Sequence, residues 1–292
     1  MKKKLFLAAA IVVVATLTAL VFATPRATPE EPLPNPNGYD DFVKAAALIN
    51  RNSPAWQDIE NDALRALVAT NQPALALIRA GLAKQCRVVP WEANQTNATH
   101  LEGLGASKAI AQAFAAASRL ALVDGKTNEA AILALDCIRY GTELPRGGVL
   151  IDYLVGIAIQ SIGRARLEEA LPDTDSATSQ KVVATLEDVV SRRELSADIW
   201  KREAQWARRG RFGPVGLFSQ MFQPFLQRGM KAKAEQKFAR ILTDLQRTKL
   251  HAAARAYELE HGQPPATARD LVPQYLKSVP LDPATGGELP LN

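Results

Sequence analysis

The sequence has few of the side chains that most often carry metal or nucleophilic chemistry. It contains three histidines and two cysteines, and it lacks both His-Glu-x-x-His and Cys-x-x-Cys. Because protein metal sites draw mainly on such clusters, we expect no metal ion and no cofactor. A nucleophile that pairs Cys86 or Cys137 with His100 in space remains an alternative to structural thiols.

Convincing alternation of apolar and polar residues is also absent, and this excludes a mostly β fold. Hydrophobic residues make up 47% of the chain and charged residues 22%, which is typical of a globular protein. Runs rich in Ala and Leu recur at helical spacing instead. The sequence therefore predicts an all-α fold, an irregular multi-helix bundle or array of helical hairpins that follows an N-terminal transmembrane helix.

The transmembrane helix is predicted from residues 5–23, LFLAAAIVVVATLTALVFA, an uncharged run that follows three lysines. About 20 apolar helical residues span the hydrocarbon core of a bilayer, and the lysines favour a cytoplasmic N-terminus. Residues 1–24 are thus a membrane anchor or, as the alternative, a cleaved signal peptide with a weak site at Val21-Phe22-Ala23. Either way, we expect the body in the periplasm; an anchor would make the chain a single-pass protein of the bacterial inner membrane.

The remainder divides into three parts by composition. Residues 25–37 hold five prolines and predict a stiff tether. A helical domain is expected over 38–230, and a long helix with a short C-terminal module over 231–292. The expected helices are 39–50, 58–70, 73–84, 105–124, 128–144, 149–162, 176–209, 217–226, 231–261 and 267–276.

The cysteine pair has two interpretations. Outside the cytoplasm, Cys86 and Cys137 can oxidise to a disulfide, and we predict this bond. Cys137 also lies on an apolar helical stripe with Leu133 and Tyr140, where a free cysteine serves as a small buried hydrophobe.

Asp152 is the best candidate for a buried acid. It lies in VLIDYLVGIAIQSI, residues 149–162, which is apolar on nearly every side. Burial disfavours a charged carboxylate. A structural role has stronger support, because Asp152 falls in the first helical turn and Arg146 is close enough in sequence to pair with it.

Positive charge is concentrated in one segment. Residues 191–250 contain 14 Lys or Arg against 5 Asp or Glu, interleaved with aromatic residues. The predicted topology argues against nucleic acid as the partner. Contact with an anionic membrane surface is one interpretation, and a solvated charged face over an aromatic core is the other. The candidate contact residues are Arg208, Arg209, Arg211, Phe212, Phe218, Phe222, Lys231 and Lys233.

The C-terminal segment 256–286 resembles the region that follows the spine helix in type II secretion major pseudopilins. The matching residues are Tyr257, Gly262, Pro264, Leu271, Val272, Pro273, Tyr275, Leu276, Pro280, Asp282 and Pro283. Together with NGYDD at 37–41, CRV at 86–88 and RGGVLID at 146–152, the whole resembles uncharacterised bacterial envelope proteins that end in this module. The resemblance implies location and fold, with no activity attached.

These observations favour a non-enzymatic, membrane-anchored helical scaffold or adaptor with a protein partner in the envelope. The alternatives are a hydrolase with a site around Asp152 or the cysteines, and a protein that binds anionic membrane surfaces.

Overall fold

The computed structural model describes residues 32–51, 56–89, 97–209, 214–283 and 285–291; the side chains of 97–101 and 206–228 lie outside the description. Over these residues the fold is all-α, with eight α-helices, two short 3-10 helices and no strand. Residues 33–292 form one compact unit. No helix within these ranges combines the length and apolar character needed to cross a membrane. The predicted span, residues 5–23, lies outside the described residues.

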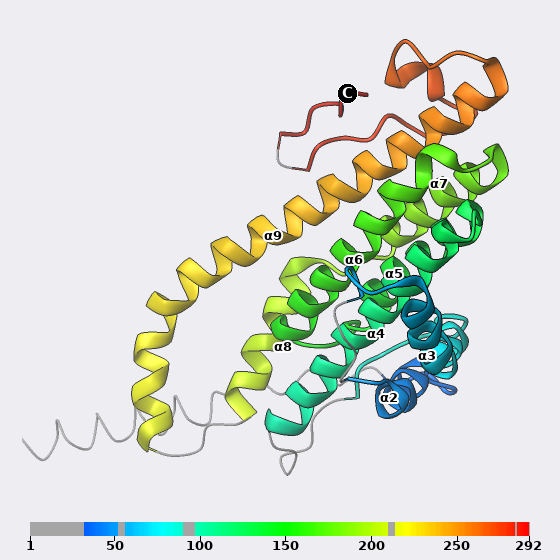
Figure 1. Cartoon of the computed structure of the whole chain (residues 1–292). Helices are drawn as coiled ribbons and strands as arrows, with labels where there is room; N and C mark the ends of the chain where they lie inside the picture. Colours follow the sequence, from blue (N-terminus) through cyan, green and yellow to red (C-terminus); the bar gives the residue numbers. More distant parts are fainter. Residues whose placement is uncertain (1–31, 52–55, 90–96, 210–213, 284, 292) are drawn as a thin grey trace, which may run out of the picture. The chain divides into compact units, whose positions relative to one another are not determined.

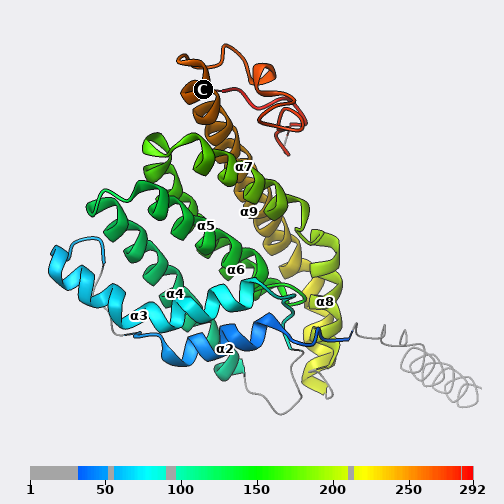
Figure 2. The same cartoon turned by 90° about the vertical axis from the view of Figure 1, so that its right-hand side faces the viewer.

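The core is a group of three adjacent helices, with two helices on one side and three on the other (Figures 1 and 2). The central helices are α4 (Asn97–Val123), α5 (Thr127–Glu143) and α6 (Leu150–Ala170). On one side lie α2 (Gly38–Leu48) and α3 (Asn61–Leu82). On the other side α7 (Ser176–Ser191) packs along α9 (Pro214–His261), and α8 (Ser196–Arg209) lies between α6 and the lower part of α9.

The predicted hairpin of 105–124 and 128–144 is confirmed as α4 and α5. Its predicted apolar stripes are buried: Ile110, Phe114, Ala117 and Ala121 in α4, and Ala130, Leu133, Cys137 and Tyr140 in α5. The turn between them uses Gly125, whose φ of 70° is a left-handed conformation that glycine adopts without strain. The hairpin thus forms because its two apolar faces bury each other at a glycine turn.

Several predicted helix boundaries were wrong. The two helices expected at 58–70 and 73–84 are the single helix α3, which contains Pro73 in its interior. Its buried stripe continues on both sides of the proline, through Val68 and Leu75. The burial of these apolar side chains therefore outweighs the absence of a backbone N–H at Pro73. Likewise α9 runs for 48 residues through Gly229, and the domain boundary predicted at 230 falls inside it.

A further difference, a break in a predicted helix, lies at the candidate site. The helix expected at 176–209 is divided into α7 and α8 by residues 192–195, which are not helical. Neither Gly nor Pro marks this break. The helix expected at 149–162 is also longer than predicted, because α6 reaches Ala170, and it is only partly buried, since Ile151 is 39% exposed.

The C-terminal module docks on α9 as its apolar pattern predicts. Leu271, Tyr275 and Leu276 are buried in the main core together with Ala253 and Ala256 of α9. Thr267 and Asp270 form the predicted capping box, in which the Thr267 N–H donates to Asp270 Oδ2 at 2.7 Å. The predicted helix to residue 276 was too long; a 3-10 helix covers only Ala268–Leu271.

Candidate functional site

A cavity of about 450 Å³ lies where five parts of the chain meet. The end of α5, the middle of α6, the α7–α8 connection, the start of α8 and the middle of α9 each contribute to its lining. Its apolar residues are Pro145, Tyr153, Ile157, Val190, Leu195, Ile199, Phe238, Ala239 and Leu242. Its polar residues are Thr142, Arg146, Gln160, Ser191, Arg192, Arg193, Glu194, Ser196 and Glu235.

The apolar side of the cavity belongs to a small second core. Leu150 of α6, Ile199 of α8, and Ala234 and Phe238 of α9 are buried together there, separately from the main core. Trp200 borders this cluster, and its indole N–H donates to Glu235 Oε1 at 2.6 Å. These contacts hold α8 and α9 at the spacing that leaves the cavity open.

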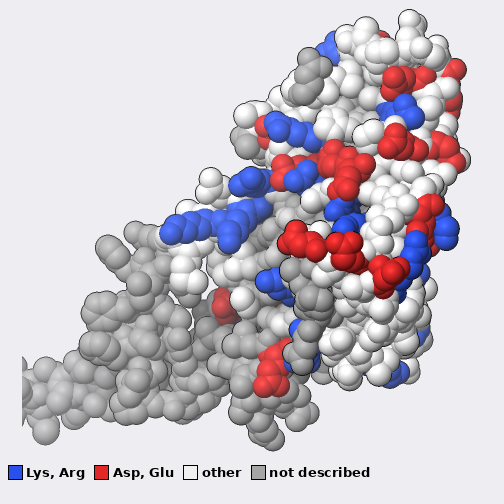
Figure 3. All heavy atoms as spheres, viewed as in Figure 1, with Lys and Arg blue, Asp and Glu red and all other residues white. Residues whose placement is uncertain are grey.

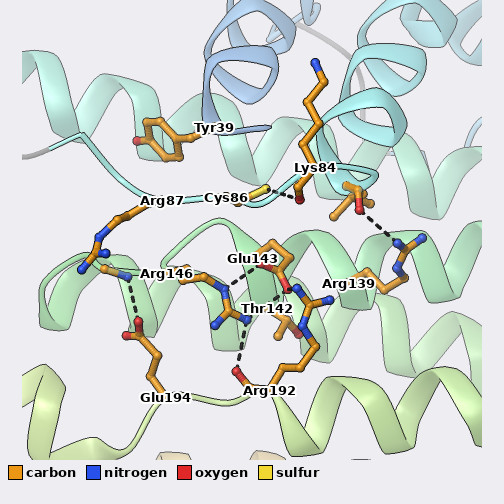
Figure 4. A network of polar contacts seen from close by, with 12 residues as sticks. Tyr39, Lys84, Cys86, Arg87, Arg139, Thr142, Glu143, Arg146, Arg192 and Glu194 are labelled. Atoms are coloured by element: carbon orange, nitrogen blue, oxygen red, sulfur yellow. Dashed lines mark hydrogen bonds and ion pairs between the residues drawn. The ribbon is translucent and has the colours of Figure 1, made fainter. Parts of the chain in front are cut away.

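Glu143, at the end of α5, pairs with two of the three arginines of the described lining (Figure 4), and Arg192 also pairs with Asp188 at 3.2 Å. Arg146 donates from Nε to Glu143 Oε2 at 2.7 Å and from Nη2 to Oε1 at 3.0 Å. Arg192 reaches the same carboxylate at 3.4 Å. Burial alone would lower the pKa of Arg146, but the hydrogen bonds and charge of Glu143 outweigh it, and the net pKa is raised.

Glu194, in the α7–α8 connection, fastens that connection to the start of α6. Its Oε1 accepts the Gly147 N–H at 3.1 Å. Its Oε2 accepts hydrogen bonds from the Tyr153 hydroxyl and from Arg202. Arg202 also donates to the Gly148 carbonyl at 2.9 Å. Both carboxylate oxygens are thus engaged by protein groups and hold the non-helical connection in place.

Arg193 differs from Arg146 and Arg192, which both form ion pairs with Glu143. Its Nη1 is buried and has no hydrogen-bond partner in the described part of the chain. Burial lowers the pKa of Arg193, and no carboxylate counteracts this effect. Because a guanidinium stays protonated in proteins, Arg193 adds a positive charge to a lining that also contains the Glu194 and Glu235 side chains.

Gln160 of α6 provides a second unsatisfied group. The residue is 5% exposed, and its Nε2 donates to the Gly141 carbonyl at 3.0 Å. That bond fixes which end of the amide is the nitrogen. Its Oε1 is buried without a partner among the residues described. Arg193 Nη1 and Gln160 Oε1 are thus both enclosed by protein without a hydrogen-bond partner among the described residues.

This arrangement suits binding. Small-molecule sites are concave and mostly apolar, have volumes of about 300–1,000 Å³ and contain a few placed polar groups. The cavity has a volume in this range, and its lining combines nine apolar with nine polar residues. Among the described residues no group of three His, Cys, Asp or Glu is arranged to hold a metal ion.

Asp152 and Arg146, the predicted acid and its candidate partner, have separate roles in the structure. Asp152 is 2% exposed, and its Oδ2 accepts the Val149 N–H at 2.8 Å in the first turn of α6. Arg146 forms its ion pair with Glu143. Asp152 therefore fixes the start of α6, and only Arg146 of the pair lines the cavity.

Both cysteines are buried free thiols, and the predicted disulfide is not formed in the structure. Cys86 lies after α3, with its Sγ 3.5 Å from the Gly81 carbonyl oxygen. Cys137 lies inside α5, with its Sγ 3.6 Å from the Ile159 carbonyl oxygen. Burial raises the pKa of Cys86 to about 12 and also raises the pKa of Cys137.

We therefore expect two free thiols per chain in unfolded, unreduced protein. In the native protein both should resist labelling, because the thiolate is the reactive species and burial disfavours it. Mass spectrometry after alkylation with and without denaturant measures this directly, and a reducing agent should leave the melting temperature unchanged. An oxidised Cys86–Cys137 pair in unreduced protein would contradict this prediction.

The predicted membrane-surface residues fall largely outside the description. Arg211 and Phe212 lie outside the described residues, and so do the side chains of Arg208, Arg209, Phe218 and Phe222. Lys231 and Lys233 are exposed on α9, where Figure 3 shows basic groups gathered over the middle of the helix. The Lys231 ammonium lies over the Trp200 ring, 5.6 Å from its centroid.

Sequence reasoning missed most of the cavity. Arg192, Arg193 and Glu194 fall within a helix in that prediction, and Gln160 lies in the predicted helix that is apolar on nearly every side. One signal was present: the apolar stripe shifts its register between Val189 and Leu195. A shift of this kind indicates a change of helix axis, and the arginine pair at the shift would then lie in a connection.

Comparisons with known proteins do not place the chain in a family: no family model, no curated protein and no solved structure matches it.

Proposed function

We propose that the chain is a non-enzymatic helical scaffold or adaptor of the bacterial envelope, anchored in the inner membrane by its N-terminal segment with the body on the periplasmic side. Its body would act by binding a partner group in the cavity between α5, α6, α8 and α9. The observation that carries this proposal is the cavity of about 450 Å³, in which apolar residues of α6, α8 and α9 lie beside polar residues that include Arg146, Arg192 and Arg193. Such a wall is suited to recognition of a partner group.

The contacts of the other candidate residues support binding over hydrolysis. Asp152 accepts a backbone hydrogen bond at the start of α6, which is a structural role. The Cys86 and Cys137 thiols are buried, with pKa values raised by desolvation. A nucleophilic cysteine needs the opposite, a lowered pKa in a partly exposed site.

A photo-crosslinking amino acid at Leu195 tests the proposal in intact membranes. Leu195 lines the cavity and is 70% exposed, so the probe can reach a bound group from the mouth. Val43, which is 55% exposed on α2, provides the control position. We expect a discrete adduct at Leu195 alone.

A cavity-filling substitution makes that test specific. Ala239→Phe places a ring in the lining from α9 and should abolish the Leu195 adduct. Equal adducts at Leu195 and Val43, or an adduct that survives Ala239→Phe, would contradict binding in the cavity.

Contact with an anionic membrane surface is a second candidate, favoured by the exposed lysines of α9. Lys231, Lys233 and Lys237 lie close together in sequence and are exposed, and each basic group near anionic lipid contributes about 1 kcal/mol. Lys231→Glu with Lys233→Glu should therefore weaken association of the full chain with vesicles that contain phosphatidylserine, and more strongly at low salt. Lys44→Glu with Lys277→Glu is the charge-matched control. Association is measured by co-flotation with the vesicles. If the two double variants co-float to the same extent, this role is contradicted.

A further inference from the structure

The helix α8 is attached to the rest of the fold differently from its neighbour α7. Among the described side chains of α8, 196–205, only Ile199 is buried. It belongs to the small second core, where Trp200 is partly buried and bonded to α9. By contrast, α7 places four valine and leucine side chains in the main core. Because stabilisation by burial grows with the apolar area removed from water, apolar packing holds α8 less firmly than α7.

Polar contacts with the start of α6 provide the remaining attachment of α8. Glu203 Oε2 accepts the Leu150 N–H at 2.9 Å, and Arg202 donates to the Gly148 carbonyl at 2.9 Å. The contacts of Glu194 fasten the connection before α8 to the same region. Such bonds contribute modestly to net stability, because water replaces each partner when the groups separate. The contact between α8 and α6 is therefore specific in geometry and depends little on apolar packing.

The cavity lies between this attachment and the main core. The connection and α8 contribute Leu195, Ser196 and Ile199 to the cavity lining. Other walls come from α6 and α9, which continue into the main core through Ile159 and Ile241. One wall is thus lightly attached, whereas the others belong to the main body of the fold. A group that fills the cavity contacts both kinds of wall and therefore favours the conformation in which they are together.

We propose that α8 is a detachable wall of the cavity. It undocks from the start of α6 together with the connection 192–195, and a group bound in the cavity holds it docked. The contacts that break are those of Glu194, Arg202 and Glu203 with the start of α6. Occupancy of the cavity is thereby converted into the position of a helix. This inference rests on the proposed function, because it adds a response to binding in the same cavity.

Hydrogen exchange of the full chain in phosphatidylcholine nanodiscs, followed by mass spectrometry, tests the undocking. An isolated helix as short as α8, with 14 residues, is marginal in water, so its amides exchange once it leaves α6. We expect residues 196–205 to exchange at least about tenfold faster than residues 180–189 of α7, because a local opening exposes α8 while the main core stays folded. Equal protection of the two helices would overturn the inference.

Glu203→Ala tests which contact holds α8. It removes the acceptor of the Leu150 N–H and should speed exchange of 196–205 by about tenfold, with α7 unchanged. Lys201→Ala is the control, because Lys201 is exposed on the same helix, and it should leave the exchange rate as in the parent. Equal rates in the two variants would contradict the role of the α6 contact. If Glu203→Ala fails to fold, the comparison of α7 with α8 in the parent still decides.

A covalent occupant tests the response to binding. Ala239 lines the cavity from α9, so Ala239→Cys treated with benzyl methanethiosulfonate places an apolar ring inside it. The modification should slow exchange of 196–205 by about threefold or more, because the ring favours docked α8. Val43→Cys, on the exposed side of α2, is the control and should show no change in α8. Unchanged or faster exchange after modification at position 239 would overturn the holding of α8 by an occupant.

The outcomes separate this inference from the proposed function. Fast exchange of α8 without a Leu195 adduct in membranes would support the undocking and contradict the binding of a partner. A Leu195 adduct with equal protection of α7 and α8 would support the binding function and overturn the detachable wall.

Discussion

Gly156→Ala is expected to lower the free energy of unfolding by about 3 kcal/mol or more, the upper part of the range for overpacked cores. A Cβ at Gly156 would lie 2.5 Å from the Gly141 carbonyl oxygen and 2.9 Å from Pro145 Cγ. The contact is reciprocal, because a Cβ at Gly141 would lie 2.6 Å from the Gly156 carbonyl oxygen. Neither backbone can move aside without separating α5 from α6.

Thermal and urea unfolding followed by circular dichroism measure this effect. At about 2–4 °C per kcal/mol for a chain of this size, the melting temperature should fall by roughly 6–12 °C. Gly105→Ala is the matched control: Gly105 is an exposed glycine within α4, and a Cβ there meets nothing within 4 Å. That change should stabilise by about 0.5–1 kcal/mol. A Gly156→Ala protein as stable as its parent would show that α5 and α6 do not cross closely.

The same crossing explains why the sequence predicts elements better than it predicts their packing. The stripes of α4 and α5 follow from helical periodicity, and the structure buries the predicted residues. In the sequence, Gly141 and Gly156 are only weak helix formers. Their function as a point of close approach depends on two helices meeting at one register, and periodicity within one helix does not contain that information.

The helix breaks show a related limit. Gly229 and Pro73 are residues that disfavour helix, yet both lie inside long helices. The break that matters, at 192–195, contains neither. There, Glu194 is held by Gly147, Tyr153 and Arg202, so tertiary contacts fix the backbone where local propensity favours helix.

The cavity could not be predicted for a similar reason. Arg193 and Gln160 are separated by more than 30 positions in the sequence and line one space only because α6, α7, α8 and α9 meet there. Sequence reasoning did identify the basic segment that contains Arg193, but it treated the positive charge as a surface property. The burial of a single guanidinium depends on the packed structure.

The C-terminal module gives the second large effect, and here sequence and structure agree. Leu271, Tyr275 and Leu276 are 0%, 7% and 1% exposed, against the end of α9. The Tyr275 hydroxyl donates to Glu260 of α9, and the Tyr257 ring meets Tyr275 edge to face at 5.7 Å. Deletion of residues 265–292 should therefore expose an apolar surface on α9 and make the body aggregate or melt at lower temperature.

Point substitutions separate docking from the consequences of a shortened chain. Leu276→Ala should lower the free energy of unfolding by about 2–5 kcal/mol, because it leaves a cavity in the core. Its neighbour Lys277 is 86% exposed and pairs with Glu187 at the surface, so Lys277→Ala should change stability little. Chemical unfolding of the two variants beside the parent measures the difference. If Leu276→Ala unfolds as the parent does, the module is not docked, and the surface of α9 beneath it is open to another partner.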